Sequence, residues 1–104
     1  MSAAPITIAL LGGGTVGAEV ARLLVQNSAD FEKRIGAPIR LTAVAVRDAS
    51  KSRPGIDPAL ITDDAASVAA SGADIVVELM GGIEPARSLI ISAMSAGSSV
   101  VTAN

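Results

Sequence analysis

Residues 6–17 read ITIALLGGGTVG and contain both a predicted strand and the turn that follows it. The apolar half of this stretch, Ile6–Leu11, has the length and composition of a buried strand. Its glycines at positions 12, 14 and 17 fit the pattern GxGxxG, and a helical repeat follows at Val16, Val20, Leu23 and Leu24. A strand, a glycine turn and a helix in this order form the phosphate-binding turn of dinucleotide-binding folds.

Each glycine of the pattern has its own expected role. Gly12 allows the tight turn out of the strand, Gly14 lets a pyrophosphate approach the backbone, and Gly17 lets the helix pack closely on the sheet. Thr15 and Val16 are expected to contact the pyrophosphate and the nicotinamide, besides starting the helix or packing in the core. The phosphates would face the free N–H groups and the positive end of the helix dipole.

The rest of the chain alternates strand-like and helix-like segments, which is typical of βαβ units. We expect further strands at 41–46, 75–79 and 99–102, a very short one at 60–62, and a polar extension or surface loop at 30–38. Helices are expected to begin after Asp57, after Asp63 or Asp64, and at Glu84-Pro85, the last with an apolar face of Ala86, Leu89, Ile90, Ala93 and Met94. The sequence therefore predicts one α/β domain over residues 1–104, a Rossmann-like doubly wound parallel sheet with helices on both faces.

The composition narrows the classes of function. Half of the 104 residues are hydrophobic but only Phe31 is aromatic, so the core must consist of Val, Ile, Leu and Ala. The net charge of −2 without a basic cluster argues against nucleic acid as a partner. No apolar stretch approaches the roughly 20 residues of a membrane span, and no signal peptide is evident, so we expect a cytoplasmic protein without a membrane partner. Because Cys and His are absent, we assign no metal site and no catalytic residue.

The residue that leaves the second strand indicates which dinucleotide is bound. NAD sites place an acidic residue there, whereas NADP sites use arginine to hold the 2′-phosphate. Arg47 occupies this position, followed by Asp48, and Lys51 and Arg53 add positive charge to the same loop. A guanidinium can meet a phosphate through two parallel donors. The sequence therefore predicts a preference for NADP, with Asp48 leaving room for NAD.

The ends of the last two strands are expected to border the other half of the cofactor. Gly81 and Gly82 would let the backbone pass close to the ribose or nicotinamide. Glu78 either lines the cleft or only pairs with Arg87 or caps a local N–H group. The chain ends at residues 102–104, where a doubly wound sheet has its ligand crevice, so we expect it to be part of a longer protein.

The stretches IALLGGGTVGAEVARLL, VAVRD, ADIVVELMGGIEPA and SVVTAN, in this order and spacing, closely resemble the N-terminal nucleotide-binding region of homoserine dehydrogenases. Members of that family reduce L-aspartate 4-semialdehyde to L-homoserine with NADPH or NADH, in the pathway to threonine, methionine and isoleucine. The resemblance covers essentially the whole chain and implies that NADP or NAD is the cofactor. The resemblance implies that the pyrophosphate is held by Gly12, Gly14, Thr15, Val16 and Gly17. It implies that Arg47 contacts the 2′-phosphate. It also implies that the nicotinamide side is bordered by Gly81, Gly82, Thr102, Ala103 and Asn104.

The resemblance also implies what lies outside this chain. In the family, the segment that matches Thr-Ala-Asn continues into a lysine important to catalysis, and a region for substrate binding and dimerisation follows. We therefore expect the chain alone to be inactive, with the amino-acid substrate and a homo-oligomeric partner engaging other regions. Two alternatives remain open: the cofactor domain of a related oxidoreductase, of the aspartate dehydrogenase or dihydrodipicolinate reductase type, or a nucleotide-binding module without chemistry.

Overall fold

A computed structural model of the chain describes residues 4–80 and 83–102. Within these ranges, five parallel strands form one sheet in the order β3-β2-β1-β4-β5. The strands are β1 (Ile6–Leu11), β2 (Ile39–Ala45), β3 (Ile61–Thr62), β4 (Ile75–Glu78) and β5 (Ser99–Thr102). The helices are α1 (Thr15–Gln26), α2 (Ser28–Ile35), α3 (Ala65–Ala69) and α4 (Ala86–Ser95), with a 3-10 turn η1 (Pro58–Leu60). The strand order reverses between β1 and β4, so the predicted Rossmann-like doubly wound fold is confirmed.

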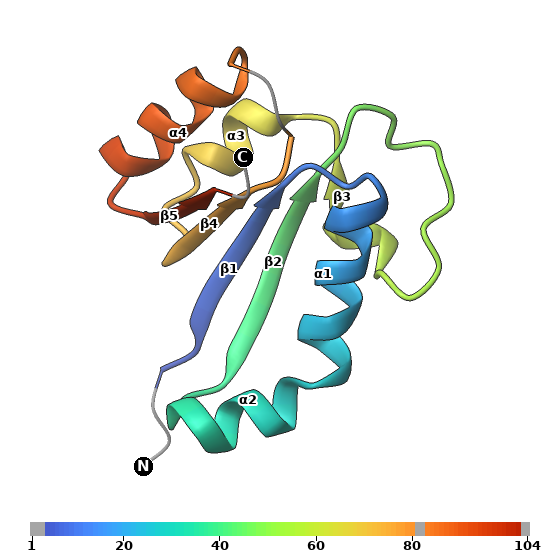
Figure 1. The fold of residues 1–104 in the computed structure, drawn as a ribbon, viewed down its shortest axis with the longest axis vertical. Helices are drawn as coiled ribbons and strands as arrows, with labels where there is room; N and C mark the ends of the chain where they lie inside the picture. The colour runs from blue at the N-terminus through green and yellow to red at the C-terminus, as the bar shows by residue number, and fades with distance from the viewer. Residues whose placement is uncertain (1–3, 81–82, 103–104) are drawn as a thin grey trace.

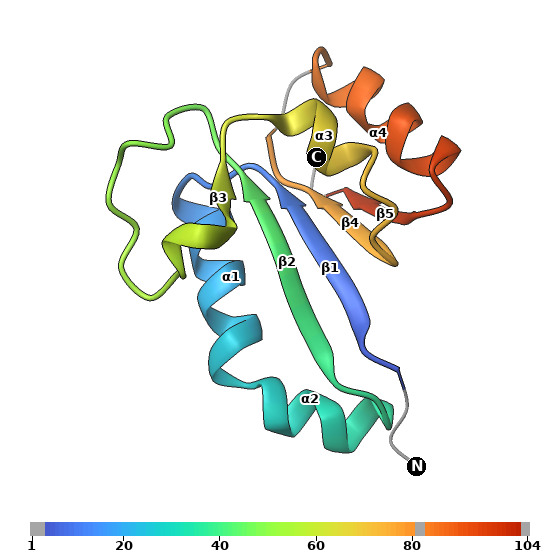
Figure 2. The same ribbon diagram turned by 180° about the vertical axis from the view of Figure 1, so that it is seen from behind.

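Helices cover both faces of the sheet (Figures 1 and 2). The alternation of side chains along β1 sends Leu10 into a cluster with α1, and Leu11 into a second cluster with α3 and α4. Both leucines are fully buried. Burial of such a side chain contributes about 1.5–3 kcal/mol, so β1 anchors two hydrophobic layers at once.

Helix α1 packs on the sheet through small residues. Gly17, Ala18 and Ala21 are its buried residues, whereas Val16 is 62% exposed and Leu23 is 45% exposed. Of the predicted helical repeat, Val20 and Leu24 pack against the buried cluster, whereas Val16 and Leu23 do not. The buried positions of this helix are thus occupied by glycine and alanine, which allow the helix to approach the sheet closely.

Helix α2 replaces the polar extension or loop that we expected at 30–38. It crosses the amino-terminal end of the sheet (Figure 1) and has no buried residue. Asp30 in its first turn and Lys33 and Arg34 in its last turn suit the helix dipole. Gly36, with φ of +84°, ends the helix in the left-handed conformation. The helix therefore forms from favourable termini rather than from an apolar face.

Helix α4 begins directly after Glu84-Pro85, close to its predicted start. Ala86, Leu89 and Ala93 are buried as expected, but Met94 is 55% exposed. Met94 was predicted to face the core, and this is wrong: among the described residues it lies outside the buried cluster that Leu89 and Ala93 join. In the part of the chain that the structure describes, no helix is long and apolar enough to cross a membrane.

A bulge in β2 sets which of its residues face α1. Ile8 of β1 pairs with Leu41 while Ala9 pairs with Ala43, so Thr42 is one extra residue in the register. The Thr42 hydroxyl donates to the carbonyl of Ile8 at 3.3 Å. Because of this extra residue, Leu41 and Val44 lie in the same cluster despite their odd spacing.

The amino-terminal ends of β1 and β4 are joined by Asp74 and Thr7. The Asp74 carboxylate accepts from the Thr7 backbone N–H at 2.8 Å and from the Thr7 hydroxyl at 3.0 Å. The Asp74 N–H donates to the same hydroxyl at 2.9 Å. These bonds, the backbone one foremost, hold the pKa of Asp74 below its ordinary value.

We predict that acid destabilises the fold partly through Asp74. Its pKa is lower in the folded chain than in the unfolded one, so its contribution is present above the unfolded pKa of 3.8 and is lost as the pH falls below that value. Asp74→Asn should therefore flatten the decrease in unfolding free energy between about pH 5 and pH 2, measured by urea unfolding. Asp63→Asn is the control for net charge, and an equal pH dependence in parent and Asp74→Asn would contradict the prediction.

Candidate functional site

A cavity of about 500 Å³ lies at the carboxyl ends of the strands. Its lining residues follow four different strands: the glycine turn after β1, Arg47 after β2, Asp63 after β3 and Met80 after β4. Open α/β sheets bind their ligands at this edge, beside the point where the strand order reverses. The fold therefore places the predicted turn and Arg47 around one hollow.

The three glycines of the pattern differ in what surrounds them. Gly12 has φ of +116°, and a Cβ there would lie 3.1 Å from the backbone carbon of Leu79. A Cβ on Gly17 would overlap the carbonyl oxygen of Gly12. A Cβ on Gly14 would meet nothing within 4 Å. The turn and the helix contact thus require Gly12 and Gly17, whereas the protein leaves open the space beside Gly14 where we expected a pyrophosphate.

Gly13, the variable position of the pattern, is also sterically required, and the sequence analysis missed it. A Cβ on Gly13 would overlap Cγ1 of Val46 and would lie 3.3 Å from Cγ1 of Val44. The turn therefore lies directly on the side chains of β2. The only signal in the sequence was a third glycine at a position that the pattern leaves free.

The start of α1 offers unpaired amide groups to this cavity. The first helical hydrogen bond is donated by Ala18 to the Gly14 carbonyl, at 2.8 Å. Among the described residues, the N–H groups of residues 14–17 donate to no backbone carbonyl, and Gly14 provides no side-chain cap. Thr15 and Val16 are both exposed here. Such a helix start is suited to a phosphate group, because its N–H donors and dipole both favour negative charge.

The loop after β2 carries the predicted 2′-phosphate contact and a second arginine. Arg47 is exposed and lines the cavity. The Asp48 carboxylate accepts from the Ser50 hydroxyl and from the Ser50 N–H at 3.0 Å, and these bonds keep its pKa low. Arg53, at the far side of the loop, donates from Nε to the carbonyl of Gly13 at 3.1 Å. Arg47 is thus available to a ligand, while Arg53 binds the glycine turn.

Glu78 lies at a different hollow from the glycine turn. It is 1% exposed, and its carboxylate accepts from the Met80 N–H at 2.7 Å and from the Thr102 hydroxyl at 2.6 Å. Glu78 and Thr102 line a hollow of about 440 Å³ on the α4 side of the sheet, together with Ile83 and Arg87. Of the roles considered for Glu78, the structure shows a cap on a local N–H group, that of Met80. Through its bond to Thr102, Glu78 also joins the ends of β4 and β5.

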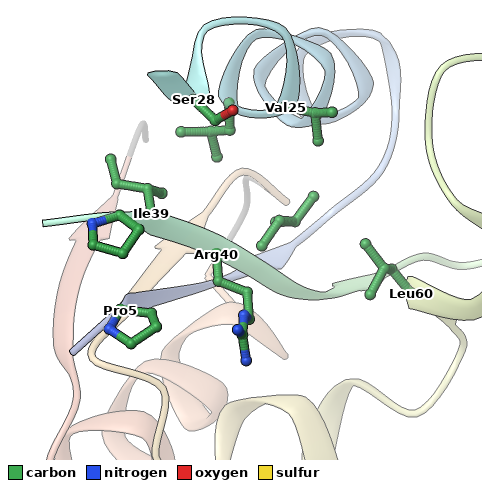
Figure 3. A pocket seen from close by; sticks show the side chains of 9 residues that line it. Pro5, Val25, Ser28, Ile39, Arg40 and Leu60 are labelled. Atoms are coloured by element: carbon green, nitrogen blue, oxygen red, sulfur yellow. The ribbon is translucent and has the colours of Figure 1, made fainter. Parts of the chain in front are cut away.

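A further hollow of about 370 Å³ lies at the opposite end of the sheet. Figure 3 shows Val25 and Ser28, from the α1–α2 corner, facing Ile39 of β2 across it, with Arg40 and Leu60 farther along. None of the predicted site residues lines this hollow.

Of the predicted contacts, Gly81, Gly82, Ala103 and Asn104 lie outside the described residues.

In the described residues, no three carboxylates gather closely enough to hold a metal ion. Asp63 and Met80 are cavity residues that the sequence analysis did not assign to the site. Asp63 could have been found, because it directly follows the short strand β3 and so reaches the carboxyl edge.

Comparison with known families gives one match that covers most of the chain. Residues 12–104 match the family model described as homoserine dehydrogenase, NAD binding domain. The homoserine dehydrogenase of Corynebacterium glutamicum is 49% identical over 100 residues, which are 95% of this chain and 22% of that protein. That of Mycobacterium tuberculosis is 45% identical over 101 residues, 96% of this chain and 23% of that protein. The chain thus spans less than a quarter of the length of these relatives.

Solved structures give the same match. A homoserine dehydrogenase from Thiobacillus denitrificans superposes with a TM-score of 0.88 at 39% identity, covering 100% of this chain and 25% of that one. One from S. aureus, solved at pH 6.5, superposes with a TM-score of 0.85 at 37% identity, covering 96% of this chain and 26% of that one.

We predict that alanine destabilises the fold at one glycine of the turn and is tolerated at another. Gly17→Ala should lower the free energy of unfolding by about 1–3 kcal/mol, because the clash with the Gly12 carbonyl outweighs the better helix propensity of alanine. Gly14→Ala should change it by no more than about 0.5 kcal/mol, since its Cβ meets open space. Urea unfolding of both variants measures this. Equal stabilities would show that the helix can move away from the turn at no cost.

Proposed function

Because the chain belongs to the homoserine dehydrogenase family and corresponds to its NAD-binding domain, we propose that it supplies the cofactor-binding part of an enzyme that interconverts L-aspartate 4-semialdehyde and L-homoserine. The observation that carries the proposal is the cavity at the switch point, where an uncapped helix start meets the open space beside Gly14. The relatives reported above are all homoserine dehydrogenases, so neither the related oxidoreductases nor a module without chemistry is favoured.

The residues of the turn fit a dinucleotide in a defined way. Gly12, Gly14 and Gly17 would hold the pyrophosphate together with Thr15 and Val16, whose amide groups are at the helix start. No side chain at Gly14 blocks the approach of the phosphates.

Arg47 would hold the adenosine side. It is exposed at the cavity, and its guanidinium suits a 2′-phosphate. We propose NADP as the preferred cofactor on this basis. Gly81, Gly82, Thr102, Ala103 and Asn104 remain our predicted contacts to the nicotinamide side, and among them Thr102 is fixed by its bond to Glu78.

The residues of this chain are suited to binding and orienting the cofactor rather than to transferring protons. Bound NADP or NAD supplies or accepts the hydride. A group that moves the alcohol proton is also required, but the sequence has no His, Cys or Tyr, and the Glu78 carboxylate already accepts two hydrogen bonds. We therefore propose that substrate binding, proton transfer and homo-oligomer formation involve regions that the longer relatives possess. A cytoplasmic location likewise stays a prediction.

Removing Arg47 tests the cofactor preference. The wild-type chain should bind NADPH more tightly than NADH, and Arg47→Ala should reduce the affinity for NADPH about 10- to 100-fold, the range of a charge-assisted contact, with little effect on NADH. Calorimetric titration measures both. Arg40→Ala is a matched control, because it removes the same charge from the other end of β2. Equal affinities in the wild type, or a preference for NADH, would refute the assignment of Arg47.

A second test concerns catalysis by the 104 residues alone. The purified chain, mixed with NADP⁺ and homoserine at alkaline pH, should show cofactor binding but no formation of reduced nicotinamide. Absorbance of the reduced nicotinamide follows the reaction, and a complete homoserine dehydrogenase is the positive control. Steady turnover that survives removal of host enzyme and is lost in Glu78→Gln would contradict the prediction and make Glu78 the proton-transfer group.

A further inference from the structure

Arg53 connects the loop after β2 to the glycine turn through backbone carbonyls. Its Nε donates to Gly13 at 3.1 Å, and its Nη1 donates to Asp48 at 2.9 Å and to Lys51 at 3.1 Å. The guanidinium is a rigid planar group, so it fixes the relative positions of these three carbonyls. Arg53 adds positive charge to the loop that carries Arg47, but its contacts in the described residues are with the protein's own backbone.

The bond to Gly13 sets the orientation of the peptide that precedes Gly14. A trans peptide is planar and its C=O and N–H groups point to opposite sides. When the Gly13 carbonyl is held toward Arg53, the Gly14 N–H must therefore point away from Arg53. This N–H is one of the amide groups without a backbone acceptor at the start of α1, and Gly14 lines the cavity.

Three glycines in succession make such an anchor necessary. Glycine has more backbone freedom than any other residue, and residues 12–14 carry no side chain that could restrain their peptides. Val46 limits the position of Gly13 by contact, but contact alone does not orient a hydrogen-bonding group. A charge-assisted bond to the carbonyl does so. Ordering the turn before a ligand binds removes part of the entropic cost of binding.

We infer that Arg53 is a positioning residue for the pyrophosphate of the dinucleotide: it holds the Gly13 peptide so that the Gly14 amide is in place before the cofactor binds. The inference rests on the proposed function, and it gives the two arginines of one loop different roles. Arg47 acts on the 2′-phosphate, which only NADP carries. Arg53 acts through the glycine turn on the pyrophosphate, which NADP and NAD share.

Calorimetric titration of NADH and NADPH into wild type and Arg53→Ala tests this division. The affinity for both cofactors should fall by a similar factor of about tenfold, so that their ratio stays unchanged. The NMR order parameters of the Gly13 and Gly14 amides, measured without cofactor, should decrease, because the turn loses its anchor. Wild-type affinity for both cofactors, or a loss confined to NADPH, would overturn the inference, the latter because it would make Arg53 a 2′-phosphate ligand.

Arg22 provides the matched control. Its Nε donates to the carbonyl of Pro54 at 3.0 Å, so it ties the same loop to α1 without contacting the glycine turn. Arg22→Ala should leave both affinities within about twofold of wild type. If it weakens binding as much as Arg53→Ala does, general loosening of the loop is the cause and the inference fails.

Arg53→Lys separates a loss of cofactor affinity from a loss of folding. It keeps the charge and the aliphatic stem, but one ammonium group cannot reproduce the planar contacts to three carbonyls. With a urea unfolding curve like that of wild type, it should still lose affinity for both cofactors, and wild-type affinity in this variant would overturn the inference. If the wild-type chain binds neither cofactor, the proposed function itself fails, which is a separate outcome.

Discussion

The contact between Gly17 and the carbonyl of Gly12 is the constraint on which the site depends. It brings the first turn of α1 against the carboxyl end of β1, and the space between them has no room for a side chain at position 17. The same closeness selects Ala18 and Ala21 for the buried face of the helix. Because the helix starts at this point, its free N–H groups lie at the reversal of the strand order. The packing of α1 on the sheet and the position of its free N–H groups therefore both require glycine at position 17.

Local patterns predicted most of the elements because the elements depend on local physics. The apolar runs of β1, β2 and β4 and the cap Asp64 of α3 were found at or near their observed positions. Helix α2 was missed because we relied on apolar periodicity, whereas its stability comes from its charged ends and Gly36. Met94 was assigned to the apolar face of α4 but is exposed. Hydrophobicity shows which side chains can be buried, whereas the packing of the elements decides which side chains are buried.

The candidate site also has features that the sequence predicts and features that it does not. The positions of the glycine turn and Arg47 were predictable, because a strand, a turn and a helix adjacent in sequence stay adjacent in space and the carboxyl ends of parallel strands meet at one edge. The roles of Gly13 and Arg53 were not predictable, since their contact joins positions 40 residues apart and depends on how the loop after β2 folds back. Glu78 shows the remaining difficulty. A carboxylate at a strand end suggests chemistry, but its surroundings, a backbone N–H and a hydroxyl, make it a structural connector.

The bulge at Thr42 has an evolutionary consequence. Side chains of a strand alternate between faces, so the extra residue decides that Val46, which lies against the glycine turn, is on the α1 side. A one-residue insertion or deletion between Ile39 and Ala45 would exchange the faces of every later residue of the strand and of Val46 and Arg47, which follow it. Related sequences should therefore vary in length in the loop beyond Arg47 or before Ile39, and keep the number of residues within this strand fixed.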